Sequence, residues 1–256
     1  MSVLRPIAFM LLATGCQRCD AQRTPHSVPK LVVEHAERTP IIDGVLSDAA
    51  WEHASSTGPF LHPRRTAPAP FAASAKMLWD ERYLYVGVEV NDDLLTASDT
   101  EHDAHLWTQD CVELMIAPRG SLPGYFEIEV SPRGIVFDTR FESRREPAPF
   151  GHVAWDGQVD VAVTLRGEIG DQEPDGGYTV EMAVPWQAFS PGEPESRPPA
   201  FGEEWRANVF VLDLSDKGQQ AVAWSPPDVP DFHVPARFGR LVFDGRERLE
   251  SPRAPH

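Results

Sequence analysis

An indole and two carboxylates stand close together in the segment 104–118, AHLWTQDCVELMIAP. Trp107 lies in a polar run, and Asp110 and Glu113 follow it. A flat apolar ring can pack against the C–H face of a pyranose, and carboxylates accept hydrogen bonds from neighbouring hydroxyl groups. These residue types therefore suggest a sugar-binding surface. The alternative is that Trp107 packs in the core and that both acids are solvated.

The residues that follow Trp107 have the period of a β-strand. Apolar residues occupy alternate positions from Val112 to Ile116, and Glu113 lies between two of them. Because successive side chains of a strand point to opposite faces, Glu113 is expected on the face away from these apolar residues. The indole of Trp107 is then expected near one end of this strand, with Asp110 and Glu113 close by.

Short alternating segments recur along the chain and are joined by Gly, Pro and Asp turns. The clearest, YLYVGVEVN at 83–91, places four apolar residues on one face. Helical patterns are confined to 47–54 and 185–189. The pattern predicts an all-β fold, an antiparallel, jelly-roll-like β-sandwich with one or two short helices. The predicted strands are 31–35, 76–79, 83–91, 111–117, 124–131, 134–140, 159–165, 177–184, 205–214, 221–224 and 239–243.

Composition and charge exclude some classes of function. With 256 residues, of which 41% are hydrophobic, the chain can bury a sizeable core, and nothing marks a second domain between 31 and 245. The formal net charge of −16 repels phosphate backbones, and the arginine pairs at 64–65 and 144–145 are isolated. We therefore expect no nucleic-acid partner.

The first residues have the pattern of an export signal. Arg5 precedes an apolar run at 7–13, which is too short to span a bilayer, and Leu-Ala-Thr-Gly-Cys follows at 12–16. Small residues before a cysteine resemble a bacterial lipobox, in which cleavage precedes the cysteine and lipid is attached to its sulfur. We therefore expect a lipoprotein-type signal peptide at 1–15 and lipidation at Cys16. An ordinary signal peptide and an uncleaved anchor are the alternatives.

The rest of the N-terminal segment bears on location. Residues 16–30 are predicted to be a polar tether, and 246–256 a polar tail. By resemblance to known sorting rules, Gln17 after the cysteine indicates the outer membrane. We expect an exported protein held there by its lipid anchor, on the periplasmic or cell-surface side. Because Cys19 lies in the tether, no disulfide with Cys111 is expected, and three cysteines at these spacings make no metal site.

Five segments occur in an order that resembles one family. They are IIDGVLSDAAW at 41–51, MLWDERYLYVGVEV at 77–90, WTQDCVELMI at 107–116, PWQAF at 185–189 and VAWSPPDVPDFHVPARFGRLVF at 222–243. In order and approximate spacing they resemble the carbohydrate-binding module family 9-like domain, over about 31–245. The resemblance implies a β-sandwich that grips the terminal sugar of a glycan between two tryptophans.

The resemblance also implies roles for individual residues. Trp107 resembles the first stacking tryptophan, and Glu113, six residues later, resembles the acid that bonds sugar hydroxyls. The second stacking position lies just before Pro-x-x-Phe-Gly, where this chain has Phe232. Val229 stands at the place of the family's asparagine. For the family's arginine, the residues at 133 and 140 are the candidates.

The sequence thus predicts non-catalytic carbohydrate binding by an exported, surface-anchored domain, at Trp107, Glu113, Phe232 and Asp110. The main alternative is a family member whose sugar site has decayed and which serves as a structural or protein-interaction module. A glycoside hydrolase would need two carboxylates at a set spacing, and Asp110 with Glu113 is the available pair.

Cofactors are not expected, although the resembling family often holds structural calcium. The carboxylates that can serve calcium here are Asp43, Asp48, Asp92 and Asp93, and no calcium site is assigned to them. A haem-binding domain is the remaining alternative, because the same superfamily includes haem binders. Its axial ligands would be drawn from Met77, Met115, His102 and His105, which are more typical of core and surface positions.

Overall fold

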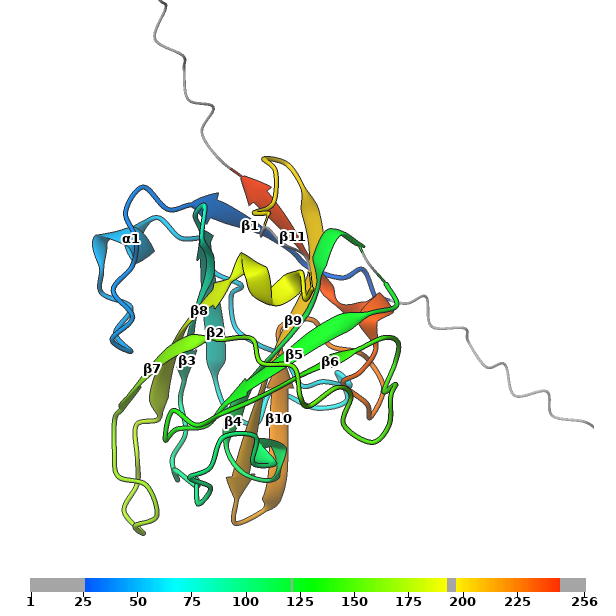
Figure 1. The fold of residues 1–256 in the computed structure, drawn as a ribbon. Helices are drawn as coiled ribbons and strands as arrows, with labels where there is room; N and C mark the ends of the chain where they lie inside the picture. The colour runs from blue at the N-terminus through cyan, green and yellow to red at the C-terminus, as the bar shows by residue number, and fades with distance from the viewer. Residues whose placement is uncertain (1–25, 121, 193–196, 245–256) are drawn as a thin grey trace, which may run out of the picture.

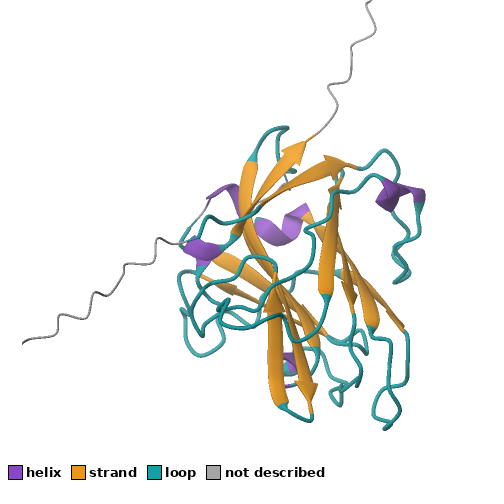
Figure 2. Ribbon diagram, turned by 180° about the vertical axis from the view of Figure 1, so that it is seen from behind, coloured by secondary structure: helices purple, strands orange, loops and turns teal. Residues whose placement is uncertain are grey.

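The computed structural model describes residues 26–120, 122–192 and 197–244. Eleven strands form the framework of this part of the chain, and loops, one α-helical turn and four single 3-10 turns join them (Figures 1 and 2). Every segment predicted to be a strand is one. The strands are β1 Lys30–His35, β2 Ala73–Trp79, β3 Tyr83–Val90, β4 Cys111–Ala117, β5 Tyr125–Val130, β6 Val136–Phe141, β7 Asp160–Leu165, β8 Tyr178–Pro185, β9 Glu204–Ser215, β10 Gly218–Ala223 and β11 Gly239–Asp244. The helical turns are α1 Ala49–Glu52, η1 Leu106–Thr108, η2 Pro118–Gly120, η3 Trp186–Phe189 and η4 Pro235–Arg237.

The strands form one curled sheet whose two halves face each other. Their order is β6-β5-β4-β9-β11-β1-β2-β3-β8-β7, and β10 pairs with β9. The first half contains β6, β5, β4, β9 and β10, and the second half contains β2, β3, β8 and β7. All pairs are antiparallel except those of β1, which runs parallel to both β11 and β2. The predicted all-β sandwich is therefore confirmed, with β1 as a parallel link between its halves (Figure 1).

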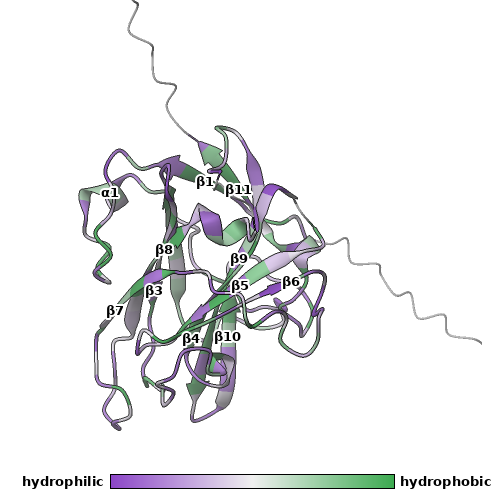
Figure 3. Cartoon of the chain, viewed as in Figure 1, coloured by the Kyte–Doolittle hydropathy of each residue, from purple (hydrophilic) through white to green (hydrophobic). Residues whose placement is uncertain are grey.

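The main core lies between the two halves. Alternate residues of most strands enter it, and hydrophobic residues run along β4 and β8 in Figure 3. Six tryptophans are buried: Trp51, Trp79, Trp155, Trp186, Trp205 and Trp224. Trp155 packs against Phe126, and its indole N–H donates to the carbonyl of Ala188 at 3.2 Å.

Strand β4 has two chemically different faces, as its alternation predicts. Val112, Leu114 and Ile116 enter the core between the halves. Cys111 and Met115 belong to a second apolar cluster on the outer face of the sheet, over β4, β5, β6 and β9. Glu113 shares the parity of this outer face, and so the candidate site lies on the outside of the first half of the sandwich.

A loop of the second half is held by one buried acid. Glu181 of β8 accepts hydrogen bonds from the backbone N–H groups of Asp43 and Gly44, at 3.0 and 2.8 Å, and from the indole N–H of Trp51 at 2.8 Å. Gly44 has a φ of 82°, and a Cβ atom there would lie 2.8 Å from the backbone of Thr164. The segment Asp-Gly…Trp is therefore the part of the family pattern that fixes this loop to the sheet.

Several predictions concern residues outside the described part of the chain. These are the signal peptide at 1–15, Cys16, most of the tether and the tail at 246–256. In the part that is described, helices are only a turn long, so none has the length or hydropathy to cross a membrane.

Candidate functional site

The outer face of the first half carries a row of four residues from adjacent strands. In register they are Phe137 of β6, Glu129 of β5, Glu113 of β4 and Phe210 of β9. Residues directly opposite one another in paired strands point to the same face. Two carboxylates are thus flanked by two aromatic rings. Since neighbouring strands lie about 4.8 Å apart, the backbones at the ends of the row are about 14 Å apart.

Trp107 lies over one end of this row. It sits on η1, directly before β4, and its half-buried ring packs edge-on against Phe137 with 5.2 Å between centroids. The backbone N–H of Trp107 donates to the carboxylate of Glu129. One ring face is stacked on His105 at 4.3 Å, and Phe150 lies 5.2 Å away at 40°. The indole is therefore a surface ring beside the carboxylates, partly covered by two other rings.

Phe232 lies over the other end. Its ring is stacked on Phe210, with centroids 4.2 Å apart and planes 6° from parallel. Phe232 also lines a cavity of about 460 Å³, whose wall includes Gln219 of β10. The side-chain amide of Gln219 donates to the carbonyl of Trp107 at 2.7 Å. The wall of the cavity therefore includes both Phe232 and Gln219, and Gln219 is hydrogen-bonded to the backbone of Trp107.

The floor between the two rings is acidic and dry. Glu113, Glu127 and Glu129 each offer an oxygen within 4.8 Å of the others, and each side chain is almost completely buried. Burial raises the pKa of Glu113 and Glu129 well above the usual range, and it raises the pKa of Glu127 to about 7. Oε1 of Glu113 and Oε1 of Glu129 are buried without a hydrogen-bond partner. Most buried polar atoms have a hydrogen-bond partner, so these two oxygens stand out.

Two loops meet over this floor through salt bridges. Arg144 and Arg145, after β6, both bind Asp231, at 2.5 and 2.8 Å. Asp231 precedes Phe232, so these salt bridges connect the loop that carries Phe232 to the loop after β6. The ring nitrogen Nδ1 of His233 lies 2.7 Å from the hydroxyl of Tyr125. Burial lowers the pKa of His233 to about 4, which keeps it neutral at pH 7.

Asp110 does not join this site, which corrects the prediction made from its proximity in sequence. It precedes β4 with the parity of Val112, so it points away from the face of Glu113. Its two carboxylate oxygens accept backbone N–H groups of Thr96 and Leu214, and its side chain has no exposed surface. Asp110 and Glu113 therefore cannot flank one glycosidic bond, which removes the pair on which a hydrolase would depend.

Asp110 belongs instead to a cluster with Asp92 and Asp213, whose carboxylate oxygens lie within 4.8 Å of one another. Oδ2 of Asp92, Oδ1 of Asp213 and the neighbouring hydroxyl of Tyr178 are all buried without a partner. Burial raises the pKa of Asp110 to about 8 and that of Asp213 to about 7. An all-oxygen set with orphaned atoms fits calcium, the metal that the resemblance implies. The fit involves Asp92 but none of the other three predicted aspartates.

Asp93 adjoins Asp92 and, after burial, its charge raises the pKa of Asp92 and of Asp213. The other two aspartates have structural roles. Asp48 accepts the backbone N–H of Ile41 at 2.6 Å, and Asp43 accepts that of Val45 at 2.9 Å. Both contacts shape the loop that Glu181 holds.

The arginine near the acidic floor was not predicted. Arg133 is committed to the carbonyl of Ala97 at 2.6 Å, and Arg140 alternates with Thr139, which places it on the other face of β6. The cation whose charge acts on Glu113 and Glu127 is Arg145. It lies on a loop with no periodic pattern. Glu127 and Glu129 could have been found, because they alternate with Phe126 and Ile128 along β5.

The residues considered for haem ligation are placed as ordinary core and surface residues. Met77 packs in the core between the halves and Met115 in the outer cluster, and both are fully buried. His102 and His105 are exposed.

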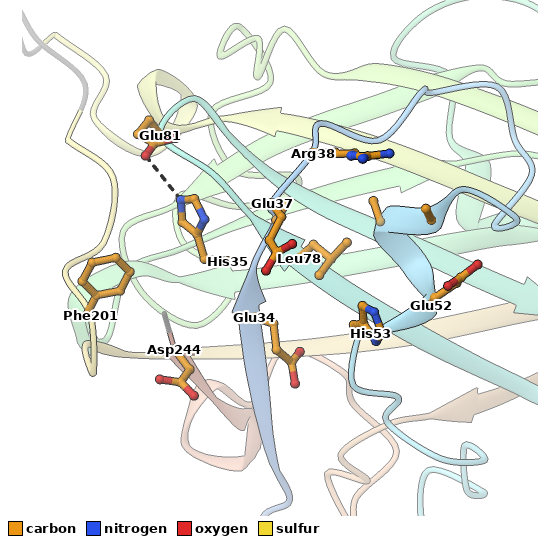
Figure 4. A pocket seen from close by; sticks show the side chains of 13 residues that line it. Glu34, His35, Glu37, Arg38, Glu52, His53, Leu78, Glu81, Phe201 and Asp244 are labelled. Carbon is orange, nitrogen blue, oxygen red and sulfur yellow. Dashed lines mark ion pairs between the residues drawn. The ribbon is translucent and has the colours of Figure 1, made fainter. Parts of the chain in front are cut away.

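A larger cavity, of about 690 Å³, lies on the second half of the sandwich (Figure 4). His35 of β1 points toward Glu81, with which it forms an ion pair at 3.4 Å, and Phe201 lies on the same side. Glu52 and His53 approach from the region of α1. Five carboxylates line the cavity against one arginine and two histidines, so its surface is acidic: Glu34, Glu37, Glu52, Glu81 and Asp244. No motif in the sequence indicated this cavity.

Comparison with known proteins assigns a family to this arrangement. The family model of the carbohydrate family 9 binding domain-like proteins matches residues 42–246. The chain belongs to the carbohydrate family 9 binding domain-like family. Within this family 9-like domain, the match spans α1 to β11, and so it includes the row of Glu113 and both flanking rings.

Similar stretches occur in much longer enzymes. Endo-1,4-beta-xylanase A of Thermotoga maritima is 28% identical over 206 residues, which are 79% of this chain and 17% of the xylanase. Exoglucanase XynX of Acetivibrio thermocellus is 25% identical over 224 residues, which are 86% of this chain and 18% of that enzyme. The family 9-like domain thus spans less than a fifth of the length of these relatives.

Solved structures share the fold. A candidate carbohydrate-binding protein of Bacteroides uniformis superimposes with a TM-score of 0.71 at 20% identity, over 85% of this chain and 100% of that chain. A carbohydrate-binding module family 9 of Caldicellulosiruptor kristjanssonii in complex with cellotriose gives 0.61 at 19% identity, over 89% and 98%. The same kind of module in complex with glucose gives 0.59 at 19%, over 87% and 100%.

Proposed function

We propose that this domain binds carbohydrate without catalysis, at the outer face of its first half. The sugar ring is held between Trp107 and Phe232, and its hydroxyl groups donate to Glu113 and to the neighbouring Glu129. Membership of the family and the fold shared with modules solved with glucose and with cellotriose support the class of ligand.

One observation supports this location above the others. Trp107 and Phe232 lie over opposite ends of a single cross-strand row whose centre is two carboxylates. Stacking on both faces of a sugar takes about 8 Å between the rings, since each contact is about 3.5–4 Å. That distance fits within the span of about 14 Å between the ends of the row. Glu113 and Glu129 lie in the floor between the rings, and their Oε1 atoms lack a hydrogen-bond partner.

The rings of His105 and Phe150 cover part of Trp107, so a sugar must compete with them. Removing Phe150 with Phe150→Ala is expected to tighten binding of glucose about three- to tenfold, because an aromatic pair contributes roughly 0.5–1.5 kcal/mol. Isothermal titration calorimetry measures the change. Val153→Ala, at an exposed position just beyond Phe150, is the matched control and should leave the affinity unchanged. Weaker binding by Phe150→Ala would show that Phe150 is itself part of the sugar site.

The proposal as a whole is tested by titrating the protein with glucose, xylose, cellotriose and xylotriose. Saturable binding of at least one sugar is expected. Absence of binding at millimolar sugar would instead favour a decayed site that serves as a structural or protein-interaction module. Phe232 in place of a second tryptophan is the feature that motivates this alternative.

We further infer that the protein is exported and held in the outer membrane by lipid on Cys16, with calcium as a structural ion at Asp92, Asp110 and Asp213. The lipobox-like segment supports the anchor, and the orphaned oxygens support the ion. In a bacterial host that processes lipoproteins, Cys16→Ser is expected to move the protein from the membrane fraction to the soluble periplasmic fraction. Retention in the membrane fraction would contradict the anchor.

A further inference from the structure

The cavity of about 460 Å³ beside Phe232 differs in charge from the rest of the molecule. The chain carries 39 acidic residues against 23 basic ones, yet none of the described residues that line this cavity is acidic. Its ionisable residues are His62 and Arg64. The volume lies within the range of about 300–1,000 Å³ that is typical of small-molecule sites. Such a cavity suits a small ligand that is neutral or anionic.

Arg64 is free to bind a ligand. It is exposed, and its side chain forms no ion pair or hydrogen bond with any residue that the structure describes. Its backbone N–H donates to Nδ1 of His62 at 3.1 Å. In a neutral imidazole whose Nδ1 accepts, the proton is on Nε2, and so the other ring nitrogen of His62 is a donor. The wall of the cavity thus offers a guanidinium and an imidazole N–H.

The acids nearby in the fold do not neutralise Arg64. Asp228 meets the loop of Arg64 through its backbone N–H, which donates to the carbonyl of Pro63 at 3.0 Å. Its carboxylate is already bound by Arg65 and Arg237, each at 2.6 Å. The next acid along this loop is held by two arginines in the same way. Both acids are therefore matched by cations of their own, and the charge of Arg64 has no counterion.

The remaining polar groups of the cavity are acceptors. The side-chain NH₂ groups of Gln219 and Gln220 are used, since they donate to the carbonyl of Trp107 at 2.7 Å and to the hydroxyl of Ser215 at 2.6 Å. Their amide oxygens have no partner in the described part of the chain and are left to accept hydroxyl groups. The apolar part of the wall consists of Phe232 and of four prolines: Pro63, Pro68, Pro70 and Pro230.

We propose that this cavity is a second sugar subsite and that it selects a uronic acid, joined to the sugar held at Phe232. The guanidinium of Arg64 binds the carboxylate, because its planar fork matches a carboxylate in two parallel hydrogen bonds. The two glutamine oxygens accept ring hydroxyls, and the prolines pack against the C–H groups. The inference rests on the proposed function, since Phe232 belongs to both sites.

The overall negative charge of the chain does not prevent this selection. At physiological ionic strength, charges more than about 8 Å apart in solvent are largely screened. A carboxylate in the cavity therefore interacts mainly with the cations at its wall and only weakly with acids elsewhere on the surface. The preference is accordingly measured at about 0.15 M salt.

The test compares sugars that differ in one group. Glucose, cellobiose and the two isomeric disaccharides in which one ring of cellobiose is glucuronic acid are titrated calorimetrically into the full chain. Both isomers are used, because the orientation of the disaccharide is set by the first site. One acidic isomer is expected to bind about three- to tenfold more tightly than cellobiose, as befits a charge-assisted pair at an exposed arginine.

Variants assign this preference to Arg64. Arg64→Gln is expected to remove it, so that the acidic disaccharide binds like cellobiose, and Arg64→Lys is expected to keep only part of it, because lysine has the charge without the fork. Arg38→Gln makes the same change of charge at an exposed arginine on the other half of the sandwich and is the matched control. It should leave the preference unchanged.

A preference that is lost in Arg64→Gln and kept in Arg38→Gln would support the subsite. Equal affinity for acidic and neutral disaccharides, or a preference that survives Arg64→Gln, would overturn it and leave the proposed function in place. Equal loss in both variants would mark a general effect of charge and would also overturn it. Absence of binding by every sugar would overturn the proposed function and the subsite together.

Discussion

Replacing Trp107 with alanine is expected to lower the affinity for glucose and cellotriose about 30- to 150-fold and to leave the fold intact. The indole supplies one of the two apolar walls, and losing such an aromatic contact costs roughly 2–3 kcal/mol of binding free energy. The side chain is half-buried and packs on Phe137 by its edge, so we expect its loss to cost only about 1–2 kcal/mol of folding free energy, less than a buried tryptophan.

The measurement is calorimetric titration of the variant with both sugars, together with urea unfolding. Phe201→Ala is the matched control, because Phe201 is an exposed aromatic residue on the other half of the sandwich. It should bind sugar like the wild type. Two results would contradict the account: unchanged affinity in Trp107→Ala, or a loss of stability of about 3–5 kcal/mol, which would mark Trp107 as a core residue.

The largest effect on stability is expected from Glu181→Ala. This substitution leaves three donors without an acceptor, namely the N–H groups of Asp43 and Gly44 and the indole N–H of Trp51, and the last two are buried. Each orphaned donor costs roughly 1–3 kcal/mol, and some will reach water as the loop loosens. We therefore expect a loss of about 3–5 kcal/mol in the free energy of unfolding, measured by urea denaturation.

Glu181→Gln separates the acceptor from the charge. The amide oxygen can still accept, but its NH₂ group faces N–H donors, so a smaller loss of about 1–3 kcal/mol is expected. Glu89→Ala, at an exposed acid on the neighbouring strand β3, should change stability by less than about 0.5 kcal/mol. Equal effects of Glu181→Ala and Glu89→Ala would show that the loop does not depend on this anchor.

The fold was predictable because a strand shows its two faces in its own sequence. In β4 the alternation separated Val112, Leu114 and Ile116 from Glu113, and the structure places them on opposite faces of the sheet. The same alternation also predicts the face of Asp110 correctly, whereas its proximity to Glu113 in sequence does not. Asp110 has the parity of Val112, so it belongs to the opposite face from Glu113, although only three residues separate them.

What could not be predicted depends on register between strands far apart in sequence. Glu113 meets Glu129 and Phe210 only because of how β4 pairs with β5 and β9. Asp213 reaches Asp110 from about a hundred residues away for the same reason. Arg145 acts on the glutamates from a loop whose sequence has no periodicity. Charge clusters of this kind follow from tertiary pairing, which no local pattern contains.

We propose that sugar binds over the row of Glu113 and Glu129, between Trp107 and Phe232. This location is tested by following the NMR signals of the ¹⁵N-labelled protein during titration with glucose. Saturable shifts are expected for the indole N–H of Trp107 and for the backbone amides of Glu113, Glu129 and Phe232, with little change around His35 and Phe201. Shifts confined to the acidic cavity at His35, or no saturable shifts at millimolar glucose, would contradict it.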